Sequence, residues 1–424
     1  MLTLWGEKTR PGNAVSRRGF LKIGAFGAGL TWADMLRQQA SASSETKAKP
    51  RPKSVIMICL FGGPPHTDTY DLKPEAPAEY RGEFKPIQTN VTGVNVCELF
   101  PLQAKMWDKL SVIRSVVAGQ SDHRDHETHT GFVEERRRPC FGSIISKIRG
   151  TSPNGMPPFV NLRFESSALE PRYLGLEHRA FAPRGEALRN LSTTSNVPPE
   201  RIGERRALLE QFDSAQQSLD TSGTSEALDS FRGRAFDMIF SGAVRNALDM
   251  SKEDARTRER YKGVEKLLLA RRLVEAGVGA VTVDIGNWDT HFDNFKYLRE
   301  WLPKVDRGVS SLIQDLHDRG LDQDVITVMW GEFGRTPLIN KRAGRDHWQP
   351  AMSTLIAGGG LKMGQMIGST TSRGEEARDR PYRVPQVLST IYKTLGIDPT
   401  QNILDHSARP MPILDDTKTI TELL

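Results

Sequence analysis

Five short runs of apolar, mostly β-branched residues recur along the chain, and each is soon followed by glycine or by polar residues. Apolar runs of about four to eight residues with such boundaries are typical of strands that are buried on both faces of a sheet. We therefore predict five buried strands. They cover Ser54–Phe61, Leu110–Val117, Ala280–Ile285, Val325–Met329 and Ser353–Ala357.

Between the runs, apolar residues recur every three or four positions, which predicts amphipathic helices. A helix over Gly263–Glu275 stops at Gly277 and leads into the strand at Ala280. Helices that lead directly into strands are typical of βαβ units, so we predict an α/β fold with a mostly parallel central sheet flanked by helices. The other predicted helices are Arg201–Leu219, Ser225–Asp249, Leu298–Arg319 and Val384–Leu395. Residues 200–276 are expected to form a helical insertion.

Histidines and carboxylates follow three of the predicted strands. The carboxyl ends of parallel strands lie at one edge of a sheet, where α/β proteins bind their ligands. We therefore expect these side chains to share one site, although each by itself is also a common turn or cap residue. The candidate metal ligands are His66, Asp68, Asp289, His291, Glu332 and His347.

A further polar cluster, SDHRDHETHTG at residues 121–131, follows the strand that begins at Leu110. It indicates either metal or phosphate chemistry or the capped start of a polar helix. Thr128 and Thr130 are candidate nucleophiles, because a hydroxyl group beside a metal can be activated. His126 is a candidate for proton transfer. Arg335 would bind a non-bridging oxygen of an anionic ester in bidentate fashion.

The composition is that of a globular protein of 424 residues, with 26% charged and 38% hydrophobic residues. That length suffices for one large α/β domain or two smaller ones. Basic residues do not gather into a dense patch with interleaved aromatics, which argues against nucleic acid as a partner. Three cysteines form no disulfide framework, although Cys97 and Cys140 remain a possible pair. The sequence does not indicate an oligomeric state.

The first 42 residues resemble an export signal. Ser16–Lys22, read as SRRGFLK, is similar to the twin-arginine motif, and a short, moderately apolar stretch leads to Ala40-Ser41-Ala42, which fits a cleavage site. Six Lys/Arg against two Asp/Glu fall in this segment, which thus supplies +4 of the net charge of +6. We predict a signal peptide at 1–42, a linker at 43–53 and a single domain at 54–424. The twin-arginine translocase is then a partner during export to the periplasm or the cell exterior.

The strand ends taken together resemble a family of exported bacterial proteins known as domain of unknown function 1501, within the alkaline phosphatase and sulfatase superfamily. The resemblance spans most of residues 54–400. The segments that carry it are GGPPHTDTYD at 62–71, SDHRDHETHTG at 121–131, NWDTHFDN at 287–294, WGEFGRTP at 330–337 and GRDHW at 344–348.

This resemblance implies an α/β sandwich that binds one or two divalent cations (Zn, Ca or Mn) beside a hydroxyl-bearing or Cys-derived nucleophile. Asp68 then matches the aspartate after the first strand, and Thr130 or Thr128 falls at the nucleophile position. Asp289 and His291 match the Asp-and-His pair of a metal, Glu332 the late carboxylate and His347 the final histidine. The expected function is metal-dependent hydrolysis of phosphate or sulfate esters outside the cytoplasm, with a sulfated or phosphorylated glycan among the possible substrates.

Three features depart from the superfamily pattern. Phe333 stands where the phosphatases carry a histidine, the gap from Asp289 to His291 is shorter than theirs, and Cys140 is not part of the Cys-x-Pro-x-Arg sequence of sulfatases. An alternative function is therefore a non-catalytic relative that binds an anionic glycan or a surface protein. A redox enzyme is a third possibility, but no G-x-G-x-x-G follows the first strand.

Overall fold

The structure is a computed structural model that describes residues 51–134, 138–150, 152, 155–185 and 242–424. Pro52–Leu424 form one compact unit. The predicted signal peptide, most of the predicted linker and the helix predicted at Arg201–Leu219 lie outside the described residues. So does most of the helix predicted at Ser225–Asp249. None of the described helices is both long and apolar enough to cross a bilayer.

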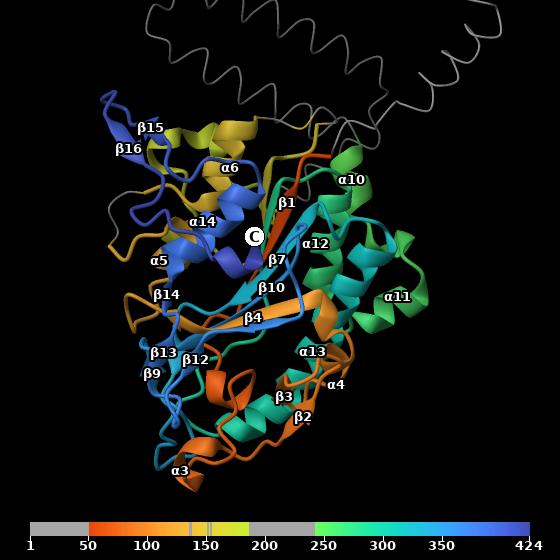
Figure 1. Ribbon diagram of the computed structural model, residues 1–424. Coiled ribbons are helices and arrows are strands. Elements are labelled where there is room, and N and C mark those ends of the chain that lie inside the picture. Colours follow the sequence, from red (N-terminus) through yellow and green to blue (C-terminus); the bar gives the residue numbers. More distant parts are fainter. Residues whose placement is uncertain (1–50, 135–137, 151, 153–154, 186–241) are drawn as a thin grey trace, which may run out of the picture. The chain divides into compact units, whose positions relative to one another are not determined.

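An eight-stranded sheet forms the centre of the described unit (Figure 1). Seven strands follow the order β11, β4, β10, β7, β1, β6 and β5, and β14 pairs with the end of β4. The strands are β1 (Ser54–Cys59), β4 (Leu110–Val117), β5 (Phe159–Asn161), β6 (Ala280–Asp284), β7 (Val325–Trp330), β10 (Met352–Gly358), β11 (Gln365–Ile367) and β14 (Tyr382–Arg383). All five predicted strands are present, and the predicted α/β fold with a mainly parallel sheet is confirmed.

Strand β10 is the exception to the parallel arrangement, since it pairs antiparallel with both β4 and β7. A parallel connection needs a crossover, usually through a helix. The 21 residues between Trp330 and Met352 contain only the short antiparallel pair β8 (Gly334–Arg335) and β9 (His347–Trp348). Without a crossover helix, the chain turns back beside β7.

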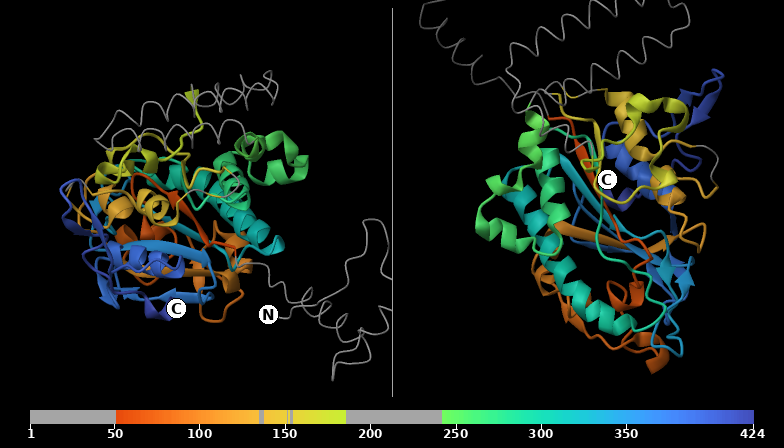
Figure 2. Two further views of the ribbon diagram at one scale, coloured as in Figure 1. Left: turned by 90° about the horizontal axis from the view of Figure 1, so that it is seen from above. Right: turned by 180° about the vertical axis from the view of Figure 1, so that it is seen from behind.

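Helices cover both faces of the sheet. Val55 and Met57 of β1 belong to the core on the side of α6 and α14, whereas Ile56 and Ile58 belong to the core on the side of α12 and α13. Figure 1 shows these two layers, and the view from behind in Figure 2 shows the same arrangement. The helices are α3 (Ala78–Arg81), α4 (Pro101–Lys105), α5 (His126–Thr130), α6 (Phe141–Arg149), α10 (Ala243–Leu248), α11 (Ala255–Arg260), α12 (Glu265–Glu275), α13 (Asn294–Asp318) and α14 (Val384–Thr394).

The remaining elements are short and lie outside the main sheet. Three more antiparallel pairs are β2 (Pro86–Gln88) with β3 (Asn95–Cys97), β12 (Ser369–Thr370) with β13 (Ala377–Asp379), and β15 (Asn402–Leu404) with β16 (Pro410–Pro412). The single-turn 3-10 helices include η1 (His66–Asp68), η2 (Trp107–Lys109) and η3 (Ser167–Leu169). All three cysteines are buried and unpaired, so Cys97 and Cys140 form no disulfide.

The register of the parallel strands brings four loops to one edge. Cys59, the last residue of β1, lies opposite both Asp284 of β6 and Trp330 of β7. β4 runs in the same direction and ends near Met352, the first residue of β10. The loops that follow β1, β4, β6 and β7 therefore all leave from the same edge of the sheet.

Candidate metal centre

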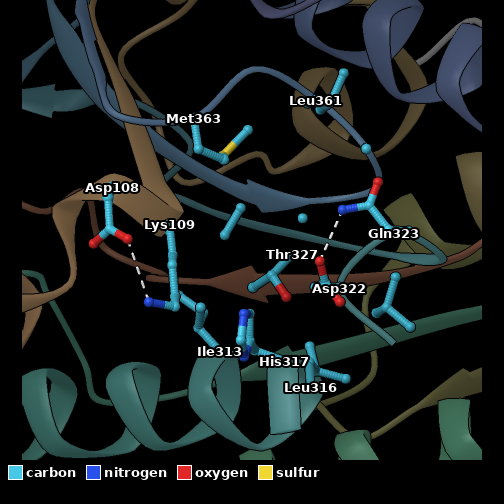
Figure 3. A pocket seen from close by; sticks show the side chains of 14 residues that line it. Asp108, Lys109, Ile313, Leu316, His317, Asp322, Gln323, Thr327, Leu361 and Met363 are labelled. Atoms are coloured by element: carbon cyan, nitrogen blue, oxygen red, sulfur yellow. Dashed lines mark hydrogen bonds and ion pairs between the residues drawn. The ribbon is translucent and has the colours of Figure 1, made fainter. Parts of the chain in front are cut away.

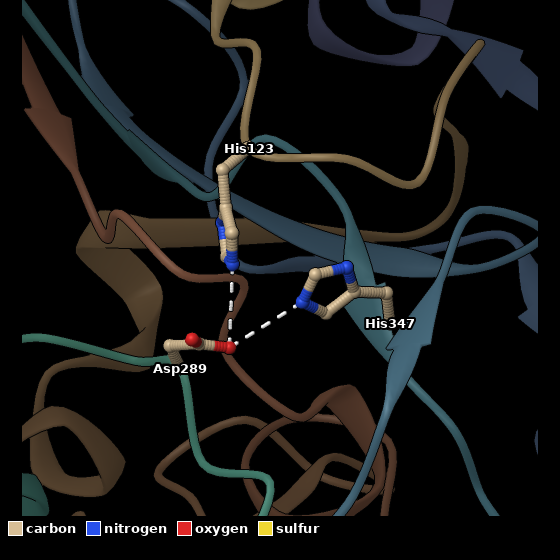
Figure 4. A group of neighbouring side chains, drawn as sticks. All are labelled: His123, Asp289 and His347. Atoms are coloured by element: carbon tan, nitrogen blue, oxygen red, sulfur yellow. Dashed lines mark hydrogen bonds and ion pairs between the residues drawn. The ribbon is translucent and has the colours of Figure 1, made fainter.

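Three histidines surround the carboxylate of Asp289 at this edge. His123 comes from the loop between β4 and α5, Asp289 and His291 from the loop between β6 and α13, and His347 from β9. The Nε2 atoms of His123, His291 and His347 lie 3.3, 3.1 and 3.3 Å from Asp289 Oδ1. Figure 4 shows the rings of His123 and His347 pointing toward this one carboxylate. A single carboxylate oxygen is thus the common neighbour of three imidazoles.

The opposite ring nitrogen of each histidine meets an oxygen of the protein. His123 Nδ1 lies 2.9 Å from Glu332 Oε1, His291 Nδ1 lies 2.6 Å from Asp346 Oδ1, and His347 Nδ1 lies 2.7 Å from the carbonyl oxygen of Ser121. An acceptor at Nδ1 holds the proton on that nitrogen and leaves the Nε2 lone pair free for a metal. All three rings are therefore oriented as metal-ligating histidines are.

Glu332 orients the site from within the protein. Its carboxylate is 4% exposed and accepts the backbone N–H of Gly62 through both oxygens, at 2.8 and 3.1 Å. Gly62 has a φ of +109°, and a Cβ there would lie 2.3 Å from the backbone nitrogen of Asp289. Only glycine allows the β1 loop to approach so closely. Glu332 thus connects the loop after β1 to His123. It contacts Nδ1 of this histidine, the ring nitrogen on the side away from Asp289.

Arg335 fixes Asp289 from the other side. Its buried guanidinium donates to Asp289 Oδ1 at 2.5 Å, to the carbonyl of Arg345 at 2.9 Å and to the carbonyl of Gly62. Its donors are thus largely occupied by the protein. Arg335 positions the Asp289 carboxylate and the loops around it, and the structure does not show it directed at an external anion as the sequence predicted.

The pKa values of Asp289, His123 and His347 are shifted in different directions by their surroundings. Burial would raise the pKa of Asp289, but the hydrogen bond and charge of Arg335 outweigh it and lower the pKa to about 2. The hydrogen bond to Glu332 raises the pKa of His123 above its usual value. Burial lowers the pKa of His347. The site thus pairs an ionised carboxylate with imidazoles of unequal basicity.

Phe333 takes part in the site through packing. Its ring is fully buried, 5.3 Å from the ring centroid of His123 and 4.5 Å from that of His347. Phe333 therefore packs against the imidazoles of His123 and His347 and supplies no ligand atom.

Two predicted ligands of the first loop lie elsewhere. Asp68 is buried, and its carboxylate accepts two hydrogen bonds of 2.7 Å from Arg345 and one of 2.9 Å from Asn294. His66 is buried, with Nε2 2.8 Å from the carbonyl oxygen of Gly374. The single turn η1 directs these side chains into the protein, where neither contacts Asp289. The prediction that Asp68 converges with the other ligands is therefore not met by the geometry.

The predicted catalytic residues of α5 are also buried. The Thr128 hydroxyl donates to the carbonyl of Asp125 at 3.0 Å, and that of Thr130 donates to the carbonyl of His126 at 2.7 Å. His126 Nε2 lies 3.2 Å from Ser167 Oγ. These contacts are those of a short helix packed into the fold. Neither threonine hydroxyl is directed at Asp289 or its three histidines.

His123 is the residue that sequence reasoning did not select from the histidine-rich segment. The signal that would have found it is the start of α5 at His126. Among the three histidines of this segment, only His123 precedes the helix and remains in the strand-end loop. His129, by contrast, is fully buried, and burial lowers its pKa to about 3.

The donor set fits a divalent transition metal. Bonds of 2.0–2.1 Å at tetrahedral angles separate neighbouring donors by about 3.3 Å. The separations of the imidazole nitrogens from Asp289 Oδ1 are 3.1–3.3 Å, and His291 Nε2 lies 3.0 Å from His347 Nε2. His123, Asp289 and His347 each offer one donor atom within 4.8 Å of the others. The donor types of these residues, and the four separations of 3.0–3.3 Å, match the ligands of a cation of zinc size.

A cavity of about 290 Å³ lies at the opposite edge of the sheet (Figure 3). It lies beside the beginning of β7 and the end of β10, and its lining includes His317 of α13, Thr327 of β7 and Met363. None of the predicted site residues lines this cavity. It is therefore separate from the histidine cluster.

Solved structures similar to this chain include lipoteichoic acid synthase LtaP from Listeria monocytogenes (9% identity, TM-score 0.36, 87% of this chain and 76% of that chain). They also include the PsFucS1 sulfatase from Pseudoalteromonas sp. (12%, 0.37, 90% and 75%) and the phosphonate monoester hydrolase SpPMH from Silicibacter pomeroyi (10%, 0.36, 82% and 73%). No curated protein matches the chain in sequence. The model of a family described as "Protein of unknown function (DUF1501)" matches residues 52–424, so the predicted family is confirmed and the chain belongs to the DUF1501 family.

Proposed function

We propose that this chain is a metal-dependent hydrolase of phosphate or sulfate esters that acts outside the cytoplasm. The observation that carries the proposal is the 3.0 Å approach of the Nε2 atoms of His291 and His347, both beside Asp289 Oδ1. When Nδ1 of each ring donates to an oxygen, these Nε2 atoms present lone pairs to each other and to a carboxylate. Lone pairs at that distance repel unless a proton or a metal cation lies between them, and a metal cation satisfies all three donors at once.

The ligand types favour zinc or manganese over calcium. Three imidazoles and one carboxylate are typical ligands of transition metals, whereas calcium takes six to eight oxygen ligands. Once bound, such a cation would polarise an ester oxygen and activate a water molecule. His123, His291, His347 and Asp289 would hold it, and Glu332 and Arg335 would fix the orientation of His123 and Asp289.

We propose water as the nucleophile in place of Thr128 and Thr130. Thr128 and Thr130 are 3% exposed, and their hydroxyls donate to backbone carbonyls of their own segment. Neither contacts Asp289 or its three histidines. Either threonine would need α5 to be displaced before it reached an ester, whereas Asp289 is exposed to solvent.

A second candidate function is supported by the same burial of the hydroxyls. A relative that retains the metal and binds an anionic glycan or surface protein needs no nucleophile. The proposed export is common to both functions, since it rests on the SRRGFLK segment, and the twin-arginine translocase would be the partner in that step.

Hydrolysis assays separate the two functions. The zinc- or manganese-loaded chain should release nitrophenol from an aryl phosphate or an aryl sulfate, and His123→Ala should reduce kcat/KM by about 100-fold or more. His317→Ala is the matched control, because this half-exposed histidine lies at the opposite edge of the sheet. A metal-loaded chain that binds inorganic phosphate but cleaves neither ester would support the non-catalytic function instead.

A further inference from the structure

A row of aromatic rings leads from the histidine cluster to the protein surface. The ring centroid of the buried Phe333 lies 5.3 Å from that of His123, which lies 5.3 Å from that of Phe61. Phe61 in turn lies 4.9 Å from Phe164 in an edge-to-face arrangement. Phe164, at the outer end, is 38% exposed. The row thus begins in the core, passes beside a proposed ligand and ends in solvent.

The outer rings are held in place by the fold. The carbonyl of Phe61 accepts the backbone N–H of Trp288 at 2.8 Å, and the next residue, Gly62, donates to Glu332. The guanidinium carbon of Arg163 lies 4.5 Å from the centroid of the Phe164 ring. Arg163 is itself 1% exposed and ion-paired with Asp125 at 2.7 Å. Phe61 and Phe164 therefore offer a preorganised aromatic surface next to the cluster.

We propose that Phe61 and Phe164 bind a ring-bearing organic group of the substrate, so that the esters taken by this site are those of aromatic or sugar rings. This inference rests on the proposed function, because the cluster would hold the phosphate or sulfate end. Aromatic side chains bind flat apolar ring faces at favourable offset or edge-to-face distances of about 4.5–7 Å. Phe164 is the specificity-determining residue, since its ring is the one that is exposed to solvent.

The test compares pairs of ligands that differ in the ring. Binding of phenylphosphonate and ethylphosphonate, and of glucose 6-phosphate and glycerol 3-phosphate, is measured by calorimetry on the full metal-loaded chain. In one pair or in both, the protein should bind the ring compound with an affinity about tenfold higher than the compound without a ring. Phe164→Ala should abolish that preference, whereas Phe164→Trp should retain it. Phe292→Ala is the matched control, because Phe292 is 59% exposed and contacts Arg342, outside the row of rings.

Three results would overturn the inference: no ring preference in the wild type, an unchanged ring preference in Phe164→Ala, or an equal loss in Phe292→Ala. Failure of this inference can be distinguished from failure of the proposed function. If the chain binds no metal and cleaves no ester but keeps a ring preference that depends on Phe164, the hydrolase proposal fails and the ring surface stands. If the chain cleaves esters without any ring preference, the ring surface fails and the hydrolase proposal stands.

Discussion

Two buried carboxylates, Glu332 and Asp68, illustrate how the site is determined at the scale of single residues. Both follow parallel strands, and both look like metal ligands in the sequence. Glu332 meets His123 and the backbone of Gly62, whereas Asp68 forms a bidentate pair with Arg345. A buried arginine needs a compensating carboxylate, since an unpaired charge in the interior is strongly destabilising. The group that each carboxylate contacts determines its role in the site, and the sequence does not show which group that is.

Glu332→Gln tests the positioning role of this carboxylate. A glutamine keeps the size but loses the charge that orients His123 and raises its pKa, so metal affinity should fall by about 10–100-fold. The thermal stability of the metal-free protein should change little by comparison. Titration calorimetry with Zn²⁺ measures the affinity, and Glu259→Gln on the exposed surface of α11 is the control. Equal affinities for Glu332→Gln and the wild type would remove Glu332 from the site.

At the scale of elements, strand ends were predictable and helix starts were not. Apolar runs locate β1, β4, β6, β7 and β10, and the strand-end rule selects Asp289, His291, Glu332 and His347. The same rule gives no boundary for α5, so it does not separate His123 from His126. The short strands β5, β11 and β14 lack apolar runs of their own, because two or three residues leave no periodicity to detect.

One contact between two helices produces a pH dependence of stability. Asp306 of α13 accepts the backbone N–H groups of Leu102 and Gln103 in α4, both at 2.9 Å. Burial raises the pKa of Asp306 to about 6. The folded protein therefore holds the proton more tightly than the unfolded chain, so this stabilisation is full below pH ~4 and is lost as pH rises through about 6.

Asp306→Asn should remove that dependence. Relative to the wild type, the free energy of unfolding of the variant should rise by about 3 kcal/mol between pH 4 and pH 7, the equivalent of a shift of about two pKa units. Urea denaturation at a series of pH values measures it. A difference between the two proteins that stays constant across this range would show that Asp306 does not titrate there.

At the scale of the whole molecule, the fold class was predictable but the order of the strands was not. Helices that lead into strands predict a parallel sheet, and the sheet is mainly parallel. The antiparallel β10 depends on the segment between β7 and β10, whose polar composition does not exclude a crossover. The convergence of four loops, which builds the site, follows from the register of β1 with β6 and β7.

The location of the protein is a property of the whole chain and is tested through its first residues. Replacing Arg17 and Arg18 by Lys should leave the protein folded but retained in the cytoplasm, because the paired arginines of the SRRGFLK segment carry the resemblance to the export signal. Cell fractionation followed by immunoblotting measures the distribution. Normal export of the double variant would show that the predicted signal peptide is wrong.

The most direct test of the account is the metal content of the chain and the metal affinity of Asp289→Ala. Asp289 Oδ1 is the atom around which the three imidazoles gather, so the variant loses the charge that attracts the cation. We predict that the wild type binds at least one equivalent of Zn²⁺ or Mn²⁺, with a rise in its unfolding temperature, and that Asp289→Ala loses both. A wild-type chain that binds neither ion, with an unfolding temperature unaffected by metal, would contradict the proposed metal centre.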